Sequence, residues 1–293
     1  MFIPELGATF AYNAKKQLLY KLRNNKSTKL IVFYDDIFFN SETLNSQFRL
    51  LRFDRKPPNQ HTFAPNTESL FLLVLSDKKE ISILNGLHGL EADKICKIQL
   101  DSSSGDSISS FDCMECRSGS EEVKVGKLGV LTEDQKLTVF KLKIDKTGAL
   151  LVLKYRFIDL KTVTGHLTTN IFSINLQNRE RGLKASKSFF VTSRDPKTSL
   201  WQFSELIITK KSLKLDPKKA CYVGCQKWSK ILQNGFFGLK HNEGYYVDAL
   251  DEKIGNKLNF GFEAVQAKIW SHPLSSKHEL WVIGKDGSVK RYE

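Results

Sequence analysis

The sequence of 293 residues has no apolar run of about 18 residues or more, so no segment reads as a membrane-spanning helix. Its N-terminus lacks the basic residues and following apolar stretch of a secretory signal. Five cysteines, an odd number, fit free thiols rather than a set of disulfides. We therefore expect a protein of a reducing compartment, without membrane insertion.

Short catalytic motifs are missing as well. No Gly-x-Ser-x-Gly marks a nucleophile elbow. Gly126 and Lys127 are followed by Leu128 rather than by Ser or Thr, so they do not form a phosphate-binding loop. Adjacent carboxylates such as Asp35 and Asp36 point to opposite faces of a strand, whereas paired acid–base catalysis needs a shared face. We expect a non-catalytic protein without a small-molecule substrate.

Two cysteine pairs suggest a zinc site that we do not favour. The pairs are Cys113 with Cys116, and Cys221 with Cys225, and four thiolates would make a closed structural site. The second spacing departs from the usual gap of two residues, and the pairs lie far apart in the chain. Small thiols alternating with apolar residues on inner strands are ordinary core. We expect no metal and no cofactor.

Helical periodicity is scarce, and strand patterns dominate. Apolar runs alternate with polar residues and are broken by turns that carry Asp or Asn. These turn residues recur at intervals of roughly 45 to 65 residues, which suggests a loose repeat. The predicted hairpins span residues 10–22, 69–84, 127–142, 187–203, 235–250 and 279–293, with turns at Asn13, Asp77, Asp134, Asp195, Asn242 and Asp286.

Further strand patterns flank the hairpins. A strand precedes several of them, at residues 107–116, 169–176, 225–233 and 264–272. Another follows several of them, at residues 29–36, 93–100, 150–158 and 205–213. Radial packing of such four-stranded units buries their faces and leaves only short edges. We predict an all-β fold, a β-propeller of six or seven four-stranded antiparallel blades, forming a single domain over residues 1–293.

One stretch, residues 164–202, resembles a WD repeat. Gly165 and His166 stand where that family has Gly-His, and Trp201 stands where it has the Trp of Trp-Asp, although Gln202 replaces the Asp. Asp195 lies six residues before Trp201, as the turn aspartate of the family does. The resemblance implies that His166, Asp195 and Trp201, with Ser193, form an internal hydrogen-bond network rather than a catalytic set.

The same six-residue offset links Asp134 to Phe140 and Asp286 to Tyr292. Only one blade carries Gly-His and none ends in Trp-Asp, so the resemblance covers most of the chain but is divergent. Most WD-repeat proteins are scaffolds of multiprotein or ribonucleoprotein assemblies. The resemblance therefore implies other protein subunits as partners.

The last hairpin raises the question of how the ring closes. Tyr292 and Glu293 stand where a WD repeat ends its third strand, and about nine residues precede the first hairpin. These residues could supply the outer strand of the last blade or the inner strand of the first, but hardly both. Three alternatives stay open: closure with a three-stranded blade, an open ring that a partner strand completes, or a seventh blade hidden near residues 29–40. The second resembles the open propellers of coat and nuclear-pore scaffolds.

Charge is uneven along the chain. The net charge is +13 and the isoelectric point about 9.4, which favours acidic partners such as RNA, DNA or acidic proteins. Residues 178–219 hold eleven basic and four acidic residues. The basic residues are Arg179, Arg181, Lys184, Lys187, Arg194, Lys197, Lys210, Lys211, Lys214, Lys218 and Lys219.

This basic segment has two interpretations. It could contact phosphates or dock an acidic partner, or it could be a solvated edge whose lysines deter strand-to-strand aggregation. On the propeller hypothesis the charge could also divide between the two ends of one blade.

We predict a non-catalytic scaffold that mediates protein–protein interactions within a nuclear or nucleolar multiprotein or ribonucleoprotein assembly. A cytoplasmic location is the alternative. The candidate surfaces are the blade rims, the basic segment and the edge at residues 279–293. The alternative function is a nucleic-acid-binding propeller that uses residues 178–219. A hydrolase built on the same fold ranks last, because it needs several converging carboxylates or histidines.

Overall fold

The computed structural model describes strands, a short helix and several turns of the chain. The residues described are 2–3, 8–13, 18–23, 26–29, 31–32, 48–52, 70–77, 79–85, 91–100, 107–116, 124–144, 150–176, 186–198, 200–209, 212–221, 227–230, 235–248, 254–271 and 278–292. They divide into two compact units, residues 1–134 with 138–155, and residues 135–137 with 156–293. No helix among them is long and apolar enough to cross a membrane.

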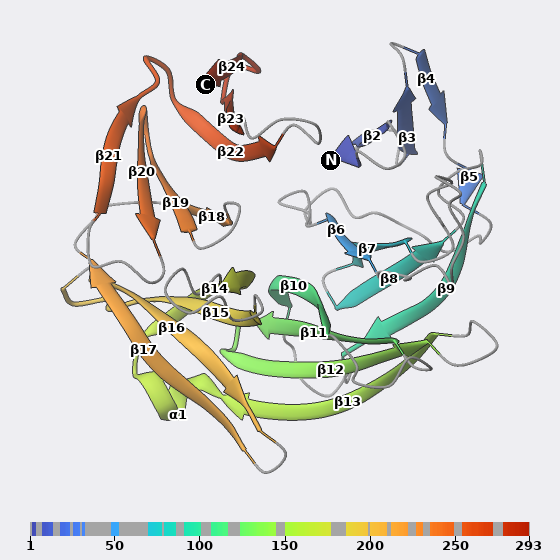
Figure 1. Cartoon of the computed structure of the whole chain (residues 1–293), viewed down its shortest axis with the longest axis horizontal. Helices are drawn as coiled ribbons and strands as arrows, with labels where there is room; N and C mark the ends of the chain where they lie inside the picture. Colours follow the sequence, from blue (N-terminus) through green and yellow to red (C-terminus); the bar gives the residue numbers. More distant parts are fainter. Residues whose placement is uncertain are drawn as a thin grey trace, which may run out of the picture. The chain divides into compact units, whose positions relative to one another are not determined.

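The first unit contains three sheets (Figure 1). The first sheet holds β1 (Phe2–Ile3), β2 (Ala8–Asn13), β3 (Leu18–Arg23) and β4 (Lys26–Lys29). The second holds β5 (Ile31–Val32), β6 (Phe48–Arg52), β7 (Leu70–Asp77), β8 (Glu80–Asn85) and β9 (Glu91–Gln99), with β5 parallel to β9. The third, mainly in this unit, holds β10 (Ile108–Cys116), β11 (Lys124–Thr132), β12 (Lys136–Ile144) and β13 (Leu150–Asp159).

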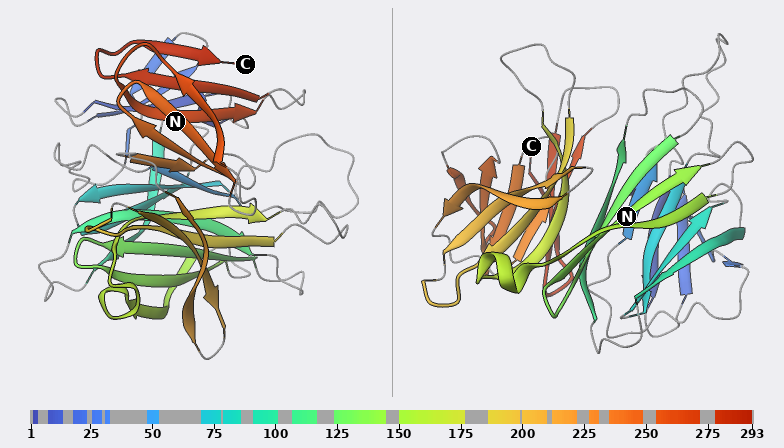
Figure 2. Two further views of the ribbon diagram at one scale, coloured as in Figure 1. Left: turned by 90° about the vertical axis from the view of Figure 1, so that its left-hand side faces the viewer. Right: turned by 90° about the horizontal axis from the view of Figure 1, so that it is seen from below.

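The second unit contains the other three sheets and a short helix, α1 (Leu160–Thr164). The fourth sheet holds β14 (Leu167–Leu176), β15 (Ser186–Arg194), β16 (Trp201–Ile208) and β17 (Leu213–Cys221). The fifth holds β18 (Lys227–Lys230), β19 (Gly235–Lys240), β20 (Glu243–Asp248) and β21 (Ile254–Asn259). The last holds β22 (Ala264–Ser271), β23 (His278–Gly284) and β24 (Val289–Tyr292). Figure 2 shows each sheet as a twisted set of neighbouring strands.

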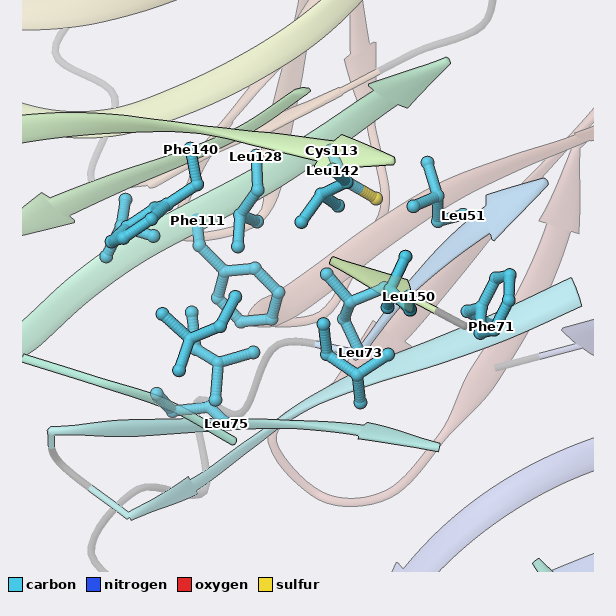
Figure 3. Packing of buried hydrophobic residues seen from close by; sticks show 14 of the residues in the cluster. Leu51, Phe71, Leu73, Leu75, Phe111, Cys113, Leu128, Phe140, Leu142 and Leu150 are labelled. Atoms are coloured by element: carbon cyan, nitrogen blue, oxygen red, sulfur yellow. The ribbon is translucent and has the colours of Figure 1, made fainter. Parts of the chain in front are cut away.

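The core of the first unit lies between its second and third sheets. Phe71, Leu73 and Leu75 alternate along β7, and Leu128 and Val130 alternate along β11, because successive strand residues point to opposite faces. These side chains belong to one buried cluster with the fully buried ring of Phe111 (Figure 3). Truncating a buried phenylalanine of this kind to alanine typically costs about 3–5 kcal/mol.

The predicted hairpins are confirmed. All six appear as antiparallel pairs of consecutive strands: β2–β3, β7–β8, β11–β12, β15–β16, β19–β20 and β23–β24. The described strands form six sheets. Of residues 29–40, where a seventh blade was a candidate, Lys29 ends β4 and Ile31–Val32 form β5, and residues 33–40 lie outside the described residues.

Two predicted outer strands are misplaced. Residues 205–208 continue β16, in which Leu206 pairs with Phe189 of β15 and Ile207 pairs with β17. The outer strand of this sheet is β17, which follows a turn closed by Thr209 and Ser212. In the first sheet the outer strand is β4 rather than residues 29–36, and Ile31 and Val32 pair with β9 instead.

The six-residue offset from the turn aspartate does not place the aromatic residues at equivalent positions. Trp201 is the first residue of β16 and pairs with Arg194 beside the turn. Tyr292 is the last residue of β24 and pairs with Leu280, three pairs further from its turn. The difference arises because the loop between β15 and β16 is longer, spanning residues 195–200.

The pairing of β1 shows which sheet the N-terminal residues join. Phe2 pairs with Thr9, and Ile3 pairs with Ala8, so β1 is the first strand of its own sheet. The last sheet has three described strands, β22, β23 and β24. Among the described strands, β1 therefore belongs to the first sheet and not to the last.

Candidate functional site

The turn of the last hairpin is fixed by its own hydrogen bonds. The Gly284 N–H donates to the Ser288 carbonyl (2.7 Å), and the Gly287 N–H donates to the Gly284 carbonyl (3.1 Å). Gly287 has φ of 84°, a left-handed conformation that glycine adopts without steric cost. The Asp286 carboxylate accepts from the Ser288 hydroxyl (2.6 Å) and N–H (2.9 Å). The hydroxyl bond, more than the N–H bond, holds the pKa of Asp286 below its usual value.

β23 presents apolar residues on both of its faces. Leu280 and Val282 are buried, and they point into the core of the second unit. Trp281 and Ile283 lie between them in sequence, and so point to the opposite face. That face is open to solvent, with 39 % of Trp281 and 38 % of Ile283 exposed.

β24 adds residues to both faces of the last sheet, beside those of β23. Val289 pairs with Ile283, and Arg291 pairs with Trp281, so these four side chains share the exposed face. Val289 is 55 % exposed. We call Trp281, Ile283, Val289 and Arg291 the outer face of the last sheet.

Aromatic rings anchor the opposite face of the same sheet. The Tyr292 ring lies 5.6 Å from the Phe260 ring, and the Phe237 ring lies 6.2 Å from the Phe260 ring. Lys290 donates from Nζ to the Phe260 carbonyl (3.0 Å) and lies over the Phe262 ring at 5.1 Å. Burial raises the pKa of the Tyr292 hydroxyl. The inner side of β24 is therefore held by packing, and its outer side carries the exposed groups.

Glu279 orders the outer face. Its Oε2 accepts a hydrogen bond from the Trp281 indole N–H (3.0 Å), and its Oε1 lies 3.6 Å from Nη1 of Arg291. One carboxylate thus positions an aromatic ring and a guanidinium side by side. A surface that holds Trp and Arg in place loses less side-chain entropy when it binds a partner.

The basic segment is divided by the turns of its sheet. Arg194 and Lys197 are exposed at the end where β15 turns into β16. Lys214 is exposed at the opposite end, beside the turn from β16 to β17, where it pairs with Ile207. Lys187 lies in β15, and Lys218 and Lys219 lie in β17. Arg179, Arg181, Lys184, Lys210 and Lys211 lie outside the described residues.

The three residues of the WD-like network lie in the fourth sheet and its loops. Asp195 accepts from the Lys197 N–H (2.8 Å) and the Thr198 hydroxyl (2.7 Å) of its own loop. The Thr198 hydrogen bond contributes most to lowering the pKa of Asp195, and the charge of His166 contributes least. Trp201 is buried, with the Arg194 guanidinium 5.9 Å from its ring.

Ser193 bonds to the Thr168 hydroxyl at 3.0 Å, which ties β15 to β14. A single network through His166, Asp195 and Trp201 stays a prediction.

The candidate zinc ligands lie in strands where the structure describes them. Cys113 is buried in the core of the first unit, and Cys116 ends β10. Cys221 is the last residue of β17, which is the outer strand of its sheet and not an inner strand. Cys225 lies outside the described residues. Among the described residues no three His, Cys, Asp or Glu side chains gather as metal ligands.

The sequence pointed to the edge at residues 279–293 but not to Trp281 and Ile283 as exposed residues. The available signal was the unbroken apolar run Leu280–Ile283, because a strand that is apolar on consecutive positions has two apolar faces. The run does not say which face is covered.

No known protein family matches the sequence, and no curated protein sequence matches it. Solved structures do. BBS1N, crystallised in complex with ARL6DN, is similar over 97 % of this chain and 74 % of that chain, with 11 % identity and a TM-score of 0.55. The WD40 domain of SCAP from fission yeast is similar over 94 % of this chain and 62 % of its own, with 9 % identity and a TM-score of 0.47.

The Nup133 β-propeller domain of Vanderwaltozyma polyspora is similar over 99 % of this chain and 83 % of its own, with 10 % identity and a TM-score of 0.44. The described sheets and the similarity to BBS1N define the class of protein: the fold is a β-propeller, built mostly of four-stranded antiparallel sheets, with one sheet of five strands and a last sheet of three described strands. At these identities the similarity concerns the fold alone.

Proposed function

We propose that this chain is a non-catalytic β-propeller subunit that binds a protein partner on the outer face of its last sheet. The observation that carries the proposal is the exposure of Trp281, Ile283 and Val289 together on one face of a three-stranded sheet. Covering exposed apolar surface contributes roughly 25 cal/mol per Å², so covering the exposed parts of these three side chains together favours association. Tryptophan and arginine are also the residues most enriched at binding hot spots.

The arrangement of the outer face supports a protein rather than a small ligand. It is the face of a three-stranded sheet with an ordered indole and guanidinium, both held by Glu279. Small ligands prefer concave sites that enclose most of their surface. BBS1N, a propeller of similar fold, is itself crystallised with a protein, ARL6DN.

A pair of matched variants tests the proposal. Trp281→Asp places a charge in the outer face, whereas Ile207→Asp changes a side chain of similar exposure, 41 %, in another sheet. We expect proteins captured by the wild-type chain from nuclease-treated extract to be retained by Ile207→Asp and lost from Trp281→Asp. Equal capture by the two variants would overturn the proposal.

The stability of the two isolated variants provides a second test of the proposal. An exposed position tolerates substitution within about 0.5 kcal/mol. We expect Trp281→Asp and Ile207→Asp to unfold at similar denaturant concentrations. A large loss of stability confined to Trp281→Asp would mean that another part of the same chain covers this face, and would contradict the proposal.

The proposed location is a nuclear or nucleolar multiprotein or ribonucleoprotein assembly. A net charge of +13 supports it, since a basic chain is attracted to acidic partners. Fluorescence imaging of the tagged chain in its own cells tests the location. Accumulation in the nucleus is expected, and uniform exclusion from the nucleus would remove this part of the proposal.

A further inference from the structure

We propose that a second surface of this chain, in its first unit, binds an acidic amphipathic helix of a protein partner. The surface is one face of the third sheet, and we call it the leucine–lysine face. It consists of Lys127 in β11, Lys141 and Lys143 in β12, and Leu151 and Leu153 in β13. It shares no residue with the outer face of the last sheet, so the proposal goes beyond the proposed function.

The lysines of this face point away from the core of the first unit. In β12, Leu142 belongs to the buried core cluster (Figure 3). Successive strand residues point to opposite faces, so Lys141 and Lys143 on either side of it point away from that core. Lys127 stands in the same relation to Leu128, a core residue of the neighbouring strand β11. All three lysines are half-buried, so their ammonium groups are accessible from one face of the sheet.

The leucines lie on the same face, in the neighbouring strand β13. Leu150 belongs to the core cluster and Val152 packs against it. Leu151 and Leu153 alternate with these residues and therefore point away from the core. Leu151 is 46 % exposed and Leu153 is 47 % exposed. Neighbouring exposed apolar residues with polar residues beside them are typical of interaction sites.

The accessible charge of this face is positive. Lys127, Lys141 and Lys143 each carry an ammonium group on it. In β10, Asp112 precedes the core residue Cys113 and so points to the same face. Asp112 is only 1 % exposed, and its carboxylate accepts the Cys113 N–H (2.9 Å), so it is not accessible to a ligand. Complementarity therefore favours a partner with acidic groups opposite the lysines.

The spacing of the leucines fits a helix that lies along β13. Residues two apart in a strand are separated by about 6.6–6.8 Å, and helix residues four apart advance by about 6 Å. One helix can therefore place apolar residues at i and i+4 against Leu151 and Leu153. β12 and β11 lie on the same side of β13, at about 5 and 10 Å from it. Acidic residues along one flank of the helix would then face the lysines.

The chemistry of the leucine–lysine face favours a protein over a nucleic acid or a membrane. Single-stranded bases stack on aromatic or guanidinium groups, and leucine offers no such surface. Peripheral membrane segments bury an apolar face about 5–10 Å deep at the boundary of the bilayer. Leu151 and Leu153 are about half covered within their own sheet, so they form a surface to be packed against rather than side chains that project.

A pair of helical peptides tests the chemistry of the partner. The first is an alanine-based helix of about 18 residues, with leucines four apart and glutamates along one flank. The second has lysine in place of each glutamate. We expect the glutamate peptide to bind the full chain about tenfold more tightly, measured by fluorescence anisotropy, because it exchanges repulsion for attraction at the lysines. Equal affinity of the two peptides, or no binding of the glutamate peptide, would overturn the proposal.

Matched variants locate the peptide on this face. Leu153→Asp and Lys141→Glu change the leucine–lysine face, whereas Lys154→Glu changes an exposed residue on the opposite face of β13. We expect Leu153→Asp to weaken binding of the glutamate peptide about tenfold, and Lys141→Glu to shift the preference toward the lysine peptide. Lys154→Glu should bind as the wild type does. An equal effect of all three variants would contradict the assigned surface.

The wild-type chain decides if Leu153→Asp fails to fold. Binding of the glutamate peptide should shift the NMR signals of the Leu151 and Leu153 methyl groups, and unshifted signals would overturn the proposal.

Two other ligands serve as competing probes, vesicles that contain phosphatidylserine and a single-stranded oligonucleotide. Binding of either one that Leu153→Asp abolishes, without binding of the glutamate peptide, would replace the helix by that ligand and overturn the proposal. Trp281→Asp should bind the glutamate peptide as the wild type does, because it leaves the leucine–lysine face unchanged. The proposed function can therefore fail while this proposal holds, and the reverse.

Discussion

Gln135 and Thr168 are joined by two hydrogen bonds that imitate strand pairing. The Thr168 N–H donates to Gln135 Oε1 (2.6 Å), and Gln135 Nε2 donates to the Thr168 carbonyl (3.0 Å). Gln135 lies in the turn between β11 and β12 with φ of 71°, and its carbonyl accepts the Leu160 N–H (2.9 Å). This one turn residue thereby makes hydrogen bonds to main-chain groups at the start of β14 and at the start of α1.

Gln135→Ala tests the importance of this link. Both residues are buried, so the substitution leaves the Thr168 N–H and C=O without those bonds, at a cost of about 1–3 kcal/mol. Chemical denaturation measures the loss, and Lys161→Ala, an exposed change on α1, should alter stability by less than about 0.5 kcal/mol. Equal stability of the two variants would show that the link contributes nothing.

Gly244 is required by the aromatic core beneath the last sheet. A Cβ atom at this position would overlap the rings of Phe237 and Phe260. We expect Gly244→Ala to destabilise the protein by roughly 1–3 kcal/mol, since a packed core must shift to admit a methyl group. Asn242→Ala, an exposed turn change nearby, is the control, and thermal unfolding is the measurement. A variant as stable as the control would contradict the packing.

Asp286 makes the last hairpin sensitive to acid. Its folded pKa is depressed, chiefly by the Ser288 hydroxyl, so its contribution to stability is present above its ordinary pKa of 3.8 and is lost as the pH falls through the folded value. Asp286→Asn should therefore be less stable than the wild type at pH 7, and the gap should close in strong acid.

Gly287→Ala is the matched control for this pH series. Its left-handed φ of 84° costs an alanine about 1–2 kcal/mol at every pH, because no charge is involved. Denaturation curves collected across the acid range compare the two variants. A gap for Asp286→Asn that stays constant with pH would contradict the assigned hydrogen bonds.

The hairpins were predictable because the information is local. The apolar–polar alternation that marks a strand and the Asp or Asn that marks its turn, such as Asp286, lie within a few residues of each other. The outer strand β17 was not predictable from the sequence. Lys214, Pro217 and Lys218 have the composition of a polar loop, and they form a strand only because β17 pairs with β16. Trp281 and Ile283 were not identified as exposed, because the unbroken apolar run makes both faces of β23 apolar and does not say which face packs on Phe260.

The alternative function, nucleic-acid binding by residues 178–219, makes a separate prediction. Affinity for single-stranded or duplex probes should fall steeply with salt, because phosphate contacts release counterions. Reversing Lys210, Lys211 and Lys214 to Glu should then abolish binding, whereas reversing Lys154 and Lys161, which are exposed outside the segment, should not. Binding that survives the first reversal would exclude the basic segment as the site.

The most direct test of the central claim is photo-crosslinking from the outer face in cells. A benzophenone side chain replaces Ile283, and the matched position is Ile207, an exposed strand residue of the fourth sheet. We expect covalent capture of a specific protein from Ile283, in nuclease-treated cells, and none of that protein from Ile207. Crosslinks from Ile283 only to other segments of the same chain, or identical products from both positions, would contradict it.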